Sequence, residues 1–296
     1  MSDRIYCSEV AQAEGASLAG TALRVDVWVL VEYARPWKSK ALEDNDLPPE
    51  VNAALAALPA RVQSASGGLA RVQFVKQAAS GDREGPRVLV ADVRTPRPVR
   101  ARTLKSYADL VDLDGRFDDF ETELPPQLLV CTNGQRDLCC ARFGLPLYEA
   151  LRLEWGPQVW QTTHVGGHRY APNLVCLPDG AMYGFVLPDL GSAVVTEHLA
   201  GRVSRDQLRG FSRHSPVEQA ALAFAREFLA EIQVDALDIS ACAADGEQVS
   251  AQITHRDGRS VTVRLRHQVG VDRVLASCGA EPKAADRFEL IEIESA

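Results

Sequence analysis

The feature that most restricts the fold is a short apolar run in the middle of the chain that ends at a cysteine. Gln127–Val130 leads into Cys131, and the polar turn Thr132–Gln135 follows. An apolar run of this length, bounded by a turn, is typical of a strand buried on both faces of a parallel sheet. Apolar residues then recur at helical spacing from Cys140 to Leu151. This order of strand, loop and helix predicts an α/β fold.

Similar patterns extend the prediction along the whole chain. Before this run we expect a helix that begins at the prolines Pro48 and Pro49 and ends before the loop Ser64–Gly68. After it we expect an amphipathic helix from Pro216 to Ile232 and a hairpin over Asn173–Leu187. The remaining predicted strands are Arg24–Glu32, Leu69–Val75, Arg87–Val93, Gln158–Thr163, Val249–His255, Ser260–Arg266 and Phe288–Ile293.

Two polar segments indicate a domain boundary near residue 120. Thr95–Arg102 is rich in proline and arginine, and Asp112–Glu123 is acidic. Such segments are typical of connections rather than of buried elements. We therefore expect an N-terminal α/β domain over residues 1–119, a second domain over 120–232 and a β-rich extension over 233–296.

Charge and hydropathy exclude several classes of protein. The 296 residues carry a formal charge of −8, which is the wrong sign for neutralising many phosphates of a nucleic acid. The longest apolar run, Val25–Tyr33, is interrupted by Asp26 and Glu32 and is far shorter than a membrane span of about 20 residues. The acidic N-terminal segment does not resemble a signal peptide, and the odd count of seven cysteines suits a reducing compartment. We expect a cytoplasmic protein that binds neither nucleic acid nor membranes.

Four side chains form a candidate metal site. Cys131 and Cys140 lie nine residues apart, and His164 and His168 lie four apart. Cysteine thiolates and imidazoles bind zinc and iron–sulfur irons, and loops at the ends of adjacent strands can bring them together. Gly166 and Gly167 make a helix between the histidines costly by roughly 2 kcal/mol, so this segment is a loop and not a zinc-protease helix.

The segments that contain these residues resemble a known family. Cys131-Thr-Asn-Gly-Gln-Arg-Asp-Leu-Cys-Cys140 and Thr163-His-Val-Gly-Gly-His-Arg-Tyr-Ala-Pro-Asn173 are similar to the paired motifs of the sucrase/ferredoxin-like family. The resemblance is specific over Leu128–Tyr183 and fades in about the last 60 residues. It implies a thioredoxin-like ferredoxin domain, preceded by a related α/β half without ligands. It also implies a [2Fe-2S] cluster held by Cys131, Cys140, His164 and His168.

A cluster of this kind implies electron transfer rather than an enzyme with its own substrate. On the analogy of Rieske centres, Cys131 and Cys140 would hold one iron, and His164 and His168 the other. Two neutral imidazoles raise the potential, to roughly −150 to +300 mV in Rieske centres against −400 mV in plant-type ferredoxins. Loss of a ring proton on oxidation would make the potential depend on pH. A redox partner protein is implied, whereas sugar hydrolysis is not, since no motif places two carboxylates.

Two other functions fit the same residues. A zinc-stabilised interaction protein would use the same four ligands, because two cysteines and two histidines also form structural zinc sites. A thiol oxidoreductase would use Cys139 or Cys140, although the chain lacks the Cys-x-x-Cys motif of such proteins.

We expect no ligand role for the remaining cysteines, histidines and tryptophans. We expect Cys7, Cys176, Cys242 and Cys278 to be inert buried thiols, most of the other histidines to be surface groups, and the tryptophans to be core anchors. Near the motifs, Arg136 and Arg169 are candidates for placing positive charge by the cluster. Asn133 and Asn173 are candidates for hydrogen bonds to a sulfur or a histidine N–H.

Overall fold

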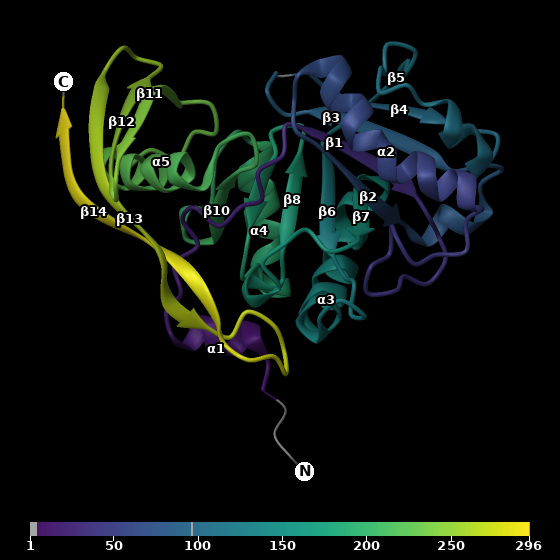
Figure 1. Ribbon diagram of the computed structural model, residues 1–296, viewed down its shortest axis with the longest axis horizontal. Coiled ribbons are helices and arrows are strands. Elements are labelled where there is room, and N and C mark those ends of the chain that lie inside the picture. The colour runs from purple at the N-terminus through teal and green to yellow at the C-terminus, as the bar shows by residue number, and fades with distance from the viewer. Residues whose placement is uncertain (1–4, 96, 296) are drawn as a thin grey trace.

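The strands form two sheets in a computed structural model of the protein, which describes residues 5–95 and 97–295 (Figure 1). The large sheet has ten strands in the order β10-β9-β8-β6-β7-β2-β1-β3-β4-β5, and the small antiparallel sheet has the order β11-β12-β13-β14. The strands of the large sheet are β1 Val27–Glu32, β2 Ala70–Lys76, β3 Arg87–Asp92, β4 Val99–Thr103, β5 Thr122–Leu124, β6 Gln127–Cys131, β7 Val159–Thr162, β8 Leu174–Leu177, β9 Ala181–Tyr183 and β10 Leu208–Phe211. The strands of the small sheet are β11 Leu237–Asp245, β12 Gln248–His255, β13 Ser260–Val274 and β14 Lys283–Ser295.

Five α-helices and five short 3-10 helices are found in the described residues. The α-helices are α1 Cys7–Ala13, α2 Pro49–Ser66, α3 Leu138–Trp155, α4 Pro188–Leu199 and α5 Pro216–Leu229. The 3-10 helices are η1 Ala78–Asp82, η2 Tyr107–Asp112, η3 Gly156–Gln158, η4 His168–Tyr170 and η5 Arg205–Gln207. No helix in the described part combines the length and the apolar character needed to cross a bilayer.

The large sheet consists of two five-strand halves with the same topology. In each half a helix connects two adjacent parallel strands, β1-α2-β2 and β6-α3-β7, and three further strands follow on the outer side of the first strand. Both halves thus contain a parallel pair extended by an antiparallel hairpin, as expected for a thioredoxin-like unit. The halves join through the antiparallel pair β2 and β7. The α/β fold and the β-rich extension are confirmed, and the boundary near residue 120, which falls within one continuous sheet, stays a prediction.

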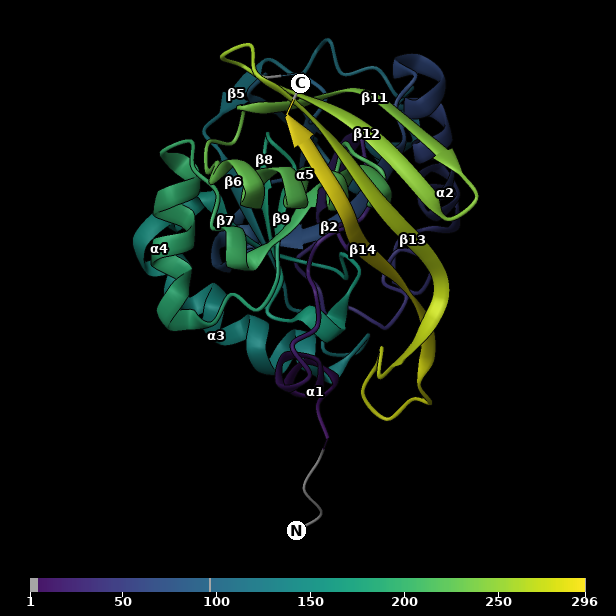
Figure 2. The same ribbon diagram turned by 90° about the vertical axis from the view of Figure 1, so that its left-hand side faces the viewer.

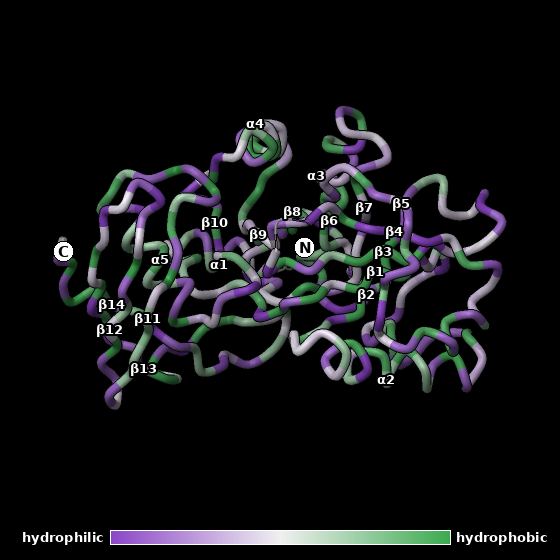
Figure 3. Tube along the Cα trace, turned by 90° about the horizontal axis from the view of Figure 1, so that it is seen from above, coloured by the Kyte–Doolittle hydropathy of each residue, from purple (hydrophilic) through white to green (hydrophobic). Residues whose placement is uncertain are grey.

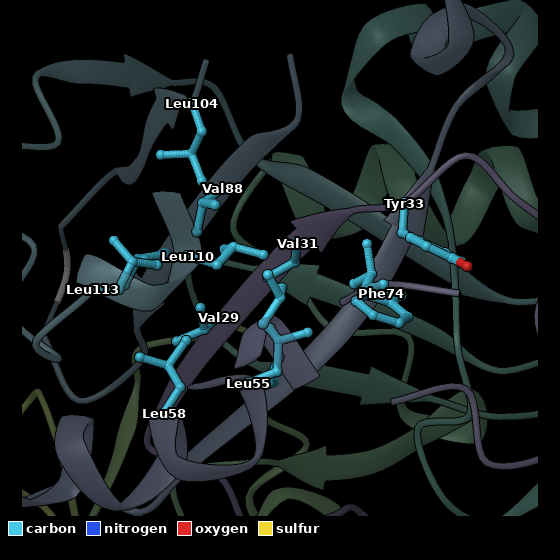
Figure 4. Close-up of a cluster of buried hydrophobic side chains, with 14 of the residues drawn as sticks. Val29, Val31, Tyr33, Leu55, Leu58, Phe74, Val88, Leu104, Leu110 and Leu113 are labelled. Atoms are coloured by element: carbon cyan, nitrogen blue, oxygen red, sulfur yellow. The ribbon is translucent and has the colours of Figure 1, made fainter. Parts of the chain in front are cut away.

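Three clusters of buried apolar side chains pack against the faces of the large sheet. One packs α2 against the face of β1 that carries Val29 and Val31 (Figure 4). A second packs α3 and α4 against β6 and β8. The third joins the inner faces of both halves and includes Trp28 from β1, Trp160 from β7, and Cys131. Trp28 and Trp160 are fully buried, so their predicted role as core anchors is confirmed.

The C-terminal extension packs its small sheet onto α5. Every second residue of β12 is buried, and these residues meet the apolar face of α5. The alternation of hydrophilic and hydrophobic residues along these strands is visible in Figure 3. β13 and β14 continue beyond this sheet as a long twisted hairpin, which we call the hairpin arm, and its tip lies against α1 (Figures 1 and 2).

Local sequence signals explain several element boundaries, and one prediction needs correction. Ser215 caps α5 and forms a capping box with Glu218, as the sequence around Pro216 suggests. Gly67 ends α2 in a left-handed conformation with φ 71°. The segment Thr95–Arg102 is not purely a connection, because β4 begins within it and pairs with β3. α4, β10 and β11 were not predicted.

Candidate metal centre

The candidate ligands lie at one edge of the large sheet because β6 and β7 are parallel neighbours. Cys131 is the last residue of β6, and His164 follows the end of β7 by two residues. Cys140 lies in the first turn of α3, which begins after the loop that leaves β6. The carboxyl ends of adjacent parallel strands are about 4.8 Å apart, so residues that leave them can share one site.

Three of the four predicted ligands converge. His164 Nδ1 lies 4.0 Å from Cys131 Sγ and 3.9 Å from Cys140 Sγ. The three ligand atoms lie within 4.8 Å of one another. Both cysteines are buried, whereas His164 is partly exposed. The site is thus apolar on its sulfur side and open on its imidazole side.

The two buried thiols shift each other's pKa in opposite directions. The hydrogen bond from Cys140, together with His164, holds the pKa of Cys131 below its usual range despite burial. The same hydrogen bond and burial raise the pKa of Cys140. One thiolate is therefore already favoured here, and thiolates are the form that binds metals.

His168 lies beside this group but not within it. Its ring centroid is 4.8 Å from that of His164, with 35° between the ring planes. Its Nδ1 is buried and finds no hydrogen-bond partner among the described residues. Its Nε2 faces Asp137 Oδ2 at 3.7 Å, and burial lowers the pKa of this histidine. An unpartnered, neutral ring nitrogen next to three converging donors fits a fourth ligand.

Asp137 connects this site to the start of α3. It caps the helix by accepting a hydrogen bond from the Cys139 N–H at 2.9 Å. Burial opposes its ionisation, but hydrogen bonds from Ser277 and from the Cys278 and Cys139 N–H groups lower its pKa to about 2. It is therefore a carboxylate at neutral pH.

Comparison with known proteins finds a family match that spans the segment in which these residues lie. The family model described as sucrase/ferredoxin-like matches residues 18–210. The chain belongs to this family. A relative, altered inheritance of mitochondria protein 32 from Meyerozyma guilliermondii, is 34% identical over 95 residues, which cover 28% of this chain and 34% of that protein. No solved structure matches.

Residues 164–168, which we call the histidine loop, are held in place by Arg209. The role of this residue was not predicted from the sequence. Arg209 is buried and donates to the Gly166 carbonyl at 3.1 Å and to Asn173 Oδ1 at 2.7 Å. Asn173 Nδ2 donates in turn to the Gly167 carbonyl at 3.0 Å. Burial lowers the pKa of Arg209 to about 10, so it remains charged. Arg209 is one of four arginines within residues 202–213, so its sequence context gives no signal of this role, which depends on β10 lying near the loop.

Gly167 is required by this arrangement. Its φ is 70°, and a Cβ at this position would overlap the guanidinium of Arg209. The Gly-Gly pair thus allows both the turn between the histidines and the close approach of the arginine.

The predicted roles of the polar residues near the site are only partly confirmed. Asn173 does not contact a sulfur or an imidazole, since it binds the loop backbone and Arg209. Asn133 donates to the Lys38 carbonyl at 3.1 Å, and its buried Oδ1 has no partner in the described part of the chain. Arg136 lines a pocket of ≈ 250 Å³ together with His164 and Arg71, so positive charge does stand beside the exposed imidazole.

Several structural interpretations of cysteines and histidines are wrong. Cys242 is exposed and Cys278 is half-buried, whereas Cys7 and Cys176 are buried as expected. Cys7 and Cys278 are not isolated, because their sulfurs meet that of Cys139. His198 and His255 are buried rather than surface groups and bind carboxylates of Asp179 and Glu231.

Proposed function

We propose that this protein transfers electrons through a [2Fe-2S] cluster held by Cys131, Cys140, His164 and His168. The observation that carries the proposal is the convergence of two buried thiols and one imidazole, with the unpartnered Nδ1 of a second imidazole beside them. The donor set matches the two cysteines and two histidines that the family resemblance implies.

The cluster would supply a one-electron redox couple, and the protein residues would set its surroundings. Cys131 and Cys140 would hold one iron inside the apolar core and exclude water from it. His164 and His168 would hold the other iron at the partly exposed side of the site. Asp137 is placed to orient His168 through Nε2, and Arg209 fixes the loop that carries both rings.

The exposed imidazole side is the proposed docking face for a redox partner protein. Arg71, Arg136 and Lys40 line the pocket next to His164 and favour a partner with an acidic surface. We place the protein in the cytoplasm, where a reducing environment maintains the seven free cysteines.

Metal analysis and visible absorption of anaerobically purified protein test this proposal. We expect about two irons and two acid-labile sulfides per chain and visible bands, which shift when His164→Cys and His168→Cys are combined. Cys242→Ser and His267→Ala are matched controls, since both residues lie in the small sheet and should leave the spectrum unchanged. A colourless wild-type protein would overturn the proposal, and so would a double variant with the same spectrum and metal content as the wild type.

One observation favours zinc as a second candidate at the same residues. The ligand atoms of Cys131, Cys140 and His164 are close enough for a single ion. A zinc ion bound at this site, lost in Cys131→Ser, would make the protein a zinc-stabilised interaction protein. A thiol oxidoreductase is less well supported, because Cys139 and Cys140 are both fully buried and a reactive thiol must be accessible.

A further inference from the structure

Three cysteines far apart in the sequence meet at a second place in the molecule, separate from the ligands described above. Cys7 lies at the start of α1, Cys139 in the first turn of α3, and Cys278 at the tip of the hairpin arm. Their sulfurs are 3.5 Å apart for Cys7 and Cys139, 3.2 Å for Cys139 and Cys278, and 3.7 Å for Cys278 and Cys7. The members of these three cysteine pairs are separated by 132, 139 and 271 positions in the chain.

Asp137 places a carboxylate oxygen over this triangle. Its Oδ1 lies 3.8 Å from Cys7 Sγ and 3.2 Å from Cys278 Sγ. Its Oδ2 is engaged elsewhere, since it accepts hydrogen bonds from Ser277 Oγ at 2.7 Å and from the Cys278 N–H at 2.8 Å. The carboxylate is therefore fixed with Oδ1 toward the sulfurs, and the four ligand atoms lie within 4.8 Å of one another.

We propose that Cys7, Cys139, Cys278 and Asp137 bind a zinc ion that fastens α1 and the tip of the hairpin arm to α3. With Zn–S bonds of about 2.3 Å, tetrahedral geometry separates two sulfurs by about 3.8 Å. The observed separations of 3.2 to 3.7 Å are close to this value and far above the S–S bond length of about 2.05 Å. Three thiolates and one carboxylate also satisfy the preference of zinc for four tetrahedral ligands.

The surroundings are suited to a structural ion. Cys7, Cys139 and Ala171 are buried together, with Tyr6 and Phe143 packed against them. Four protein ligands would leave no coordination position of the ion open, as in structural rather than catalytic zinc sites. Cys139 lies in the first turn of α3, and the N-terminus of a helix favours negative charge.

The ion would attach the tip of the hairpin arm and α1 to α3. The arm extends beyond the small sheet and reaches α1 at its end (Figure 1). Because Cys139 precedes Cys140, the ion would also hold the turn of α3 that supplies a proposed cluster ligand. The zinc proposal does not depend on the cluster, since the two sites share no ligand.

Zinc analysis of the full-length protein purified without chelators tests the site. We expect one zinc per chain at this site in the wild type, and the loss of that equivalent in Cys278→Ser and in Cys7→Ser. Cys242→Ser, which changes an exposed cysteine of β11, should keep the zinc. Unchanged zinc in both cysteine variants, or none in the wild type after incubation with zinc, would overturn the proposal.

Two further measurements separate zinc binding from misfolding and from a disulfide. In the wild type, a thiol-alkylating reagent should label the half-buried Cys278 at least tenfold faster after a chelator removes zinc, as measured by peptide mass. Cobalt added to the zinc-free Cys131→Ser variant should give the visible bands of tetrahedral cobalt–thiolate. A Cys139–Cys278 disulfide in peptides from protein that was never reduced, or alkylation rates that do not change with the chelator, would contradict a zinc site.

Discussion

The two halves of the large sheet have the same strand order, but different residues stand at the carboxyl ends of their parallel strands. In the second half, Cys131 ends β6 and His164 follows β7. In the first half, Glu32 ends β1, and its buried carboxylate pairs with Arg83. The shared topology therefore provides an edge where two loops meet, and the residues in those loops decide whether the edge can bind a metal.

The first half closes this edge with aromatic side chains. Tyr33, which follows β1, stacks on Phe74 of β2 with 4.5 Å between ring centroids and 18° between ring planes. Both rings appear in Figure 4. Tyr107 Oη donates to the Glu32 carbonyl at 3.0 Å. Apolar packing thus occupies the place that sulfur and nitrogen donors occupy in the second half.

The largest expected contrast comes from the last residues of the two equivalent strands. Cys131→Ser should abolish iron binding and visible absorption, because a buried thiolate ligand is lost. Glu32→Gln should keep the iron and lower the free energy of unfolding by about 1–3 kcal/mol, because Arg83 loses a buried charged partner. Iron analysis and urea unfolding of both variants measure the contrast. Loss of iron in Glu32→Gln would remove the functional difference between the halves.

The next contrast tests whether the halves unfold as one unit. Trp28 Nε1 donates to Ser212 Oγ at 3.1 Å, across to the second half. Trp160 from the second half lies in the same apolar cluster. Trp28→Ala and Trp160→Ala should each lower the free energy of unfolding by about 3–5 kcal/mol. Calorimetry should show one shared transition for the large sheet, and two separate transitions that each respond to one variant would show independent halves.

The two halves are also expected to differ in their response to acid, because all six histidines follow residue 160. Burial lowers the pKa of His214 to about 4, with Arg213 and Arg24 opposing its charge and Glu218 and Asp238 favouring it. This pKa is below the usual histidine value of about 6.5. The contribution of His214 to the free energy of unfolding is therefore complete above pH 6.5 and is lost as the pH falls toward 4. The maximum loss is about 3 kcal/mol.

Replacement of His214 by glutamine should remove that part of the acid sensitivity. Urea unfolding of wild type and His214→Gln at pH 7 and pH 4.5 measures it, and the variant should lose less stability between the two pH values. An identical loss in both proteins would show that His214 does not contribute.

The smallest contrast compares two glycines with nearly the same backbone conformation. Gly67 ends α2 with φ 71° and open space around it, whereas Gly167 has φ 70° and touches Arg209. Gly67→Ala should cost about 1–2 kcal/mol of stability from backbone strain alone. Gly167→Ala should cost more and also reduce iron occupancy, because Arg209 must move away from the histidine loop. Equal stability and full iron occupancy in both variants would refute the role of Arg209 in holding the loop.

The sequence predicted the parts of the fold that depend on local patterns. The strand ending at Cys131, the helix after Pro48 and the capped helix after Ser215 were found close to their predicted positions. The spacing of cysteines and histidines also identified Cys131, Cys140 and His164, which converge in space. These features are encoded within short segments, where hydrophobic period, capping residues and ligand types can be recognised directly.

The features that were missed depend on long-range packing. The contact of Arg209 with the histidine loop requires β10 to lie beside residues 43 positions earlier. The meeting of Cys7 with Cys278 requires the hairpin arm to reach α1, across 271 positions. Because neither cysteine has a ligand at short spacing, their sequence context resembled that of ordinary buried thiols.

Pulsed electron paramagnetic resonance of the chemically reduced protein tests the central claim most directly. Two histidine ligands predict two distinct strong nitrogen couplings in the spectrum of a reduced [2Fe-2S] cluster, and His168→Cys should remove one of them. The same spectrum in wild type and His168→Cys, or no paramagnetic signal from protein that contains zinc at Cys131, Cys140 and His164, would contradict the claim.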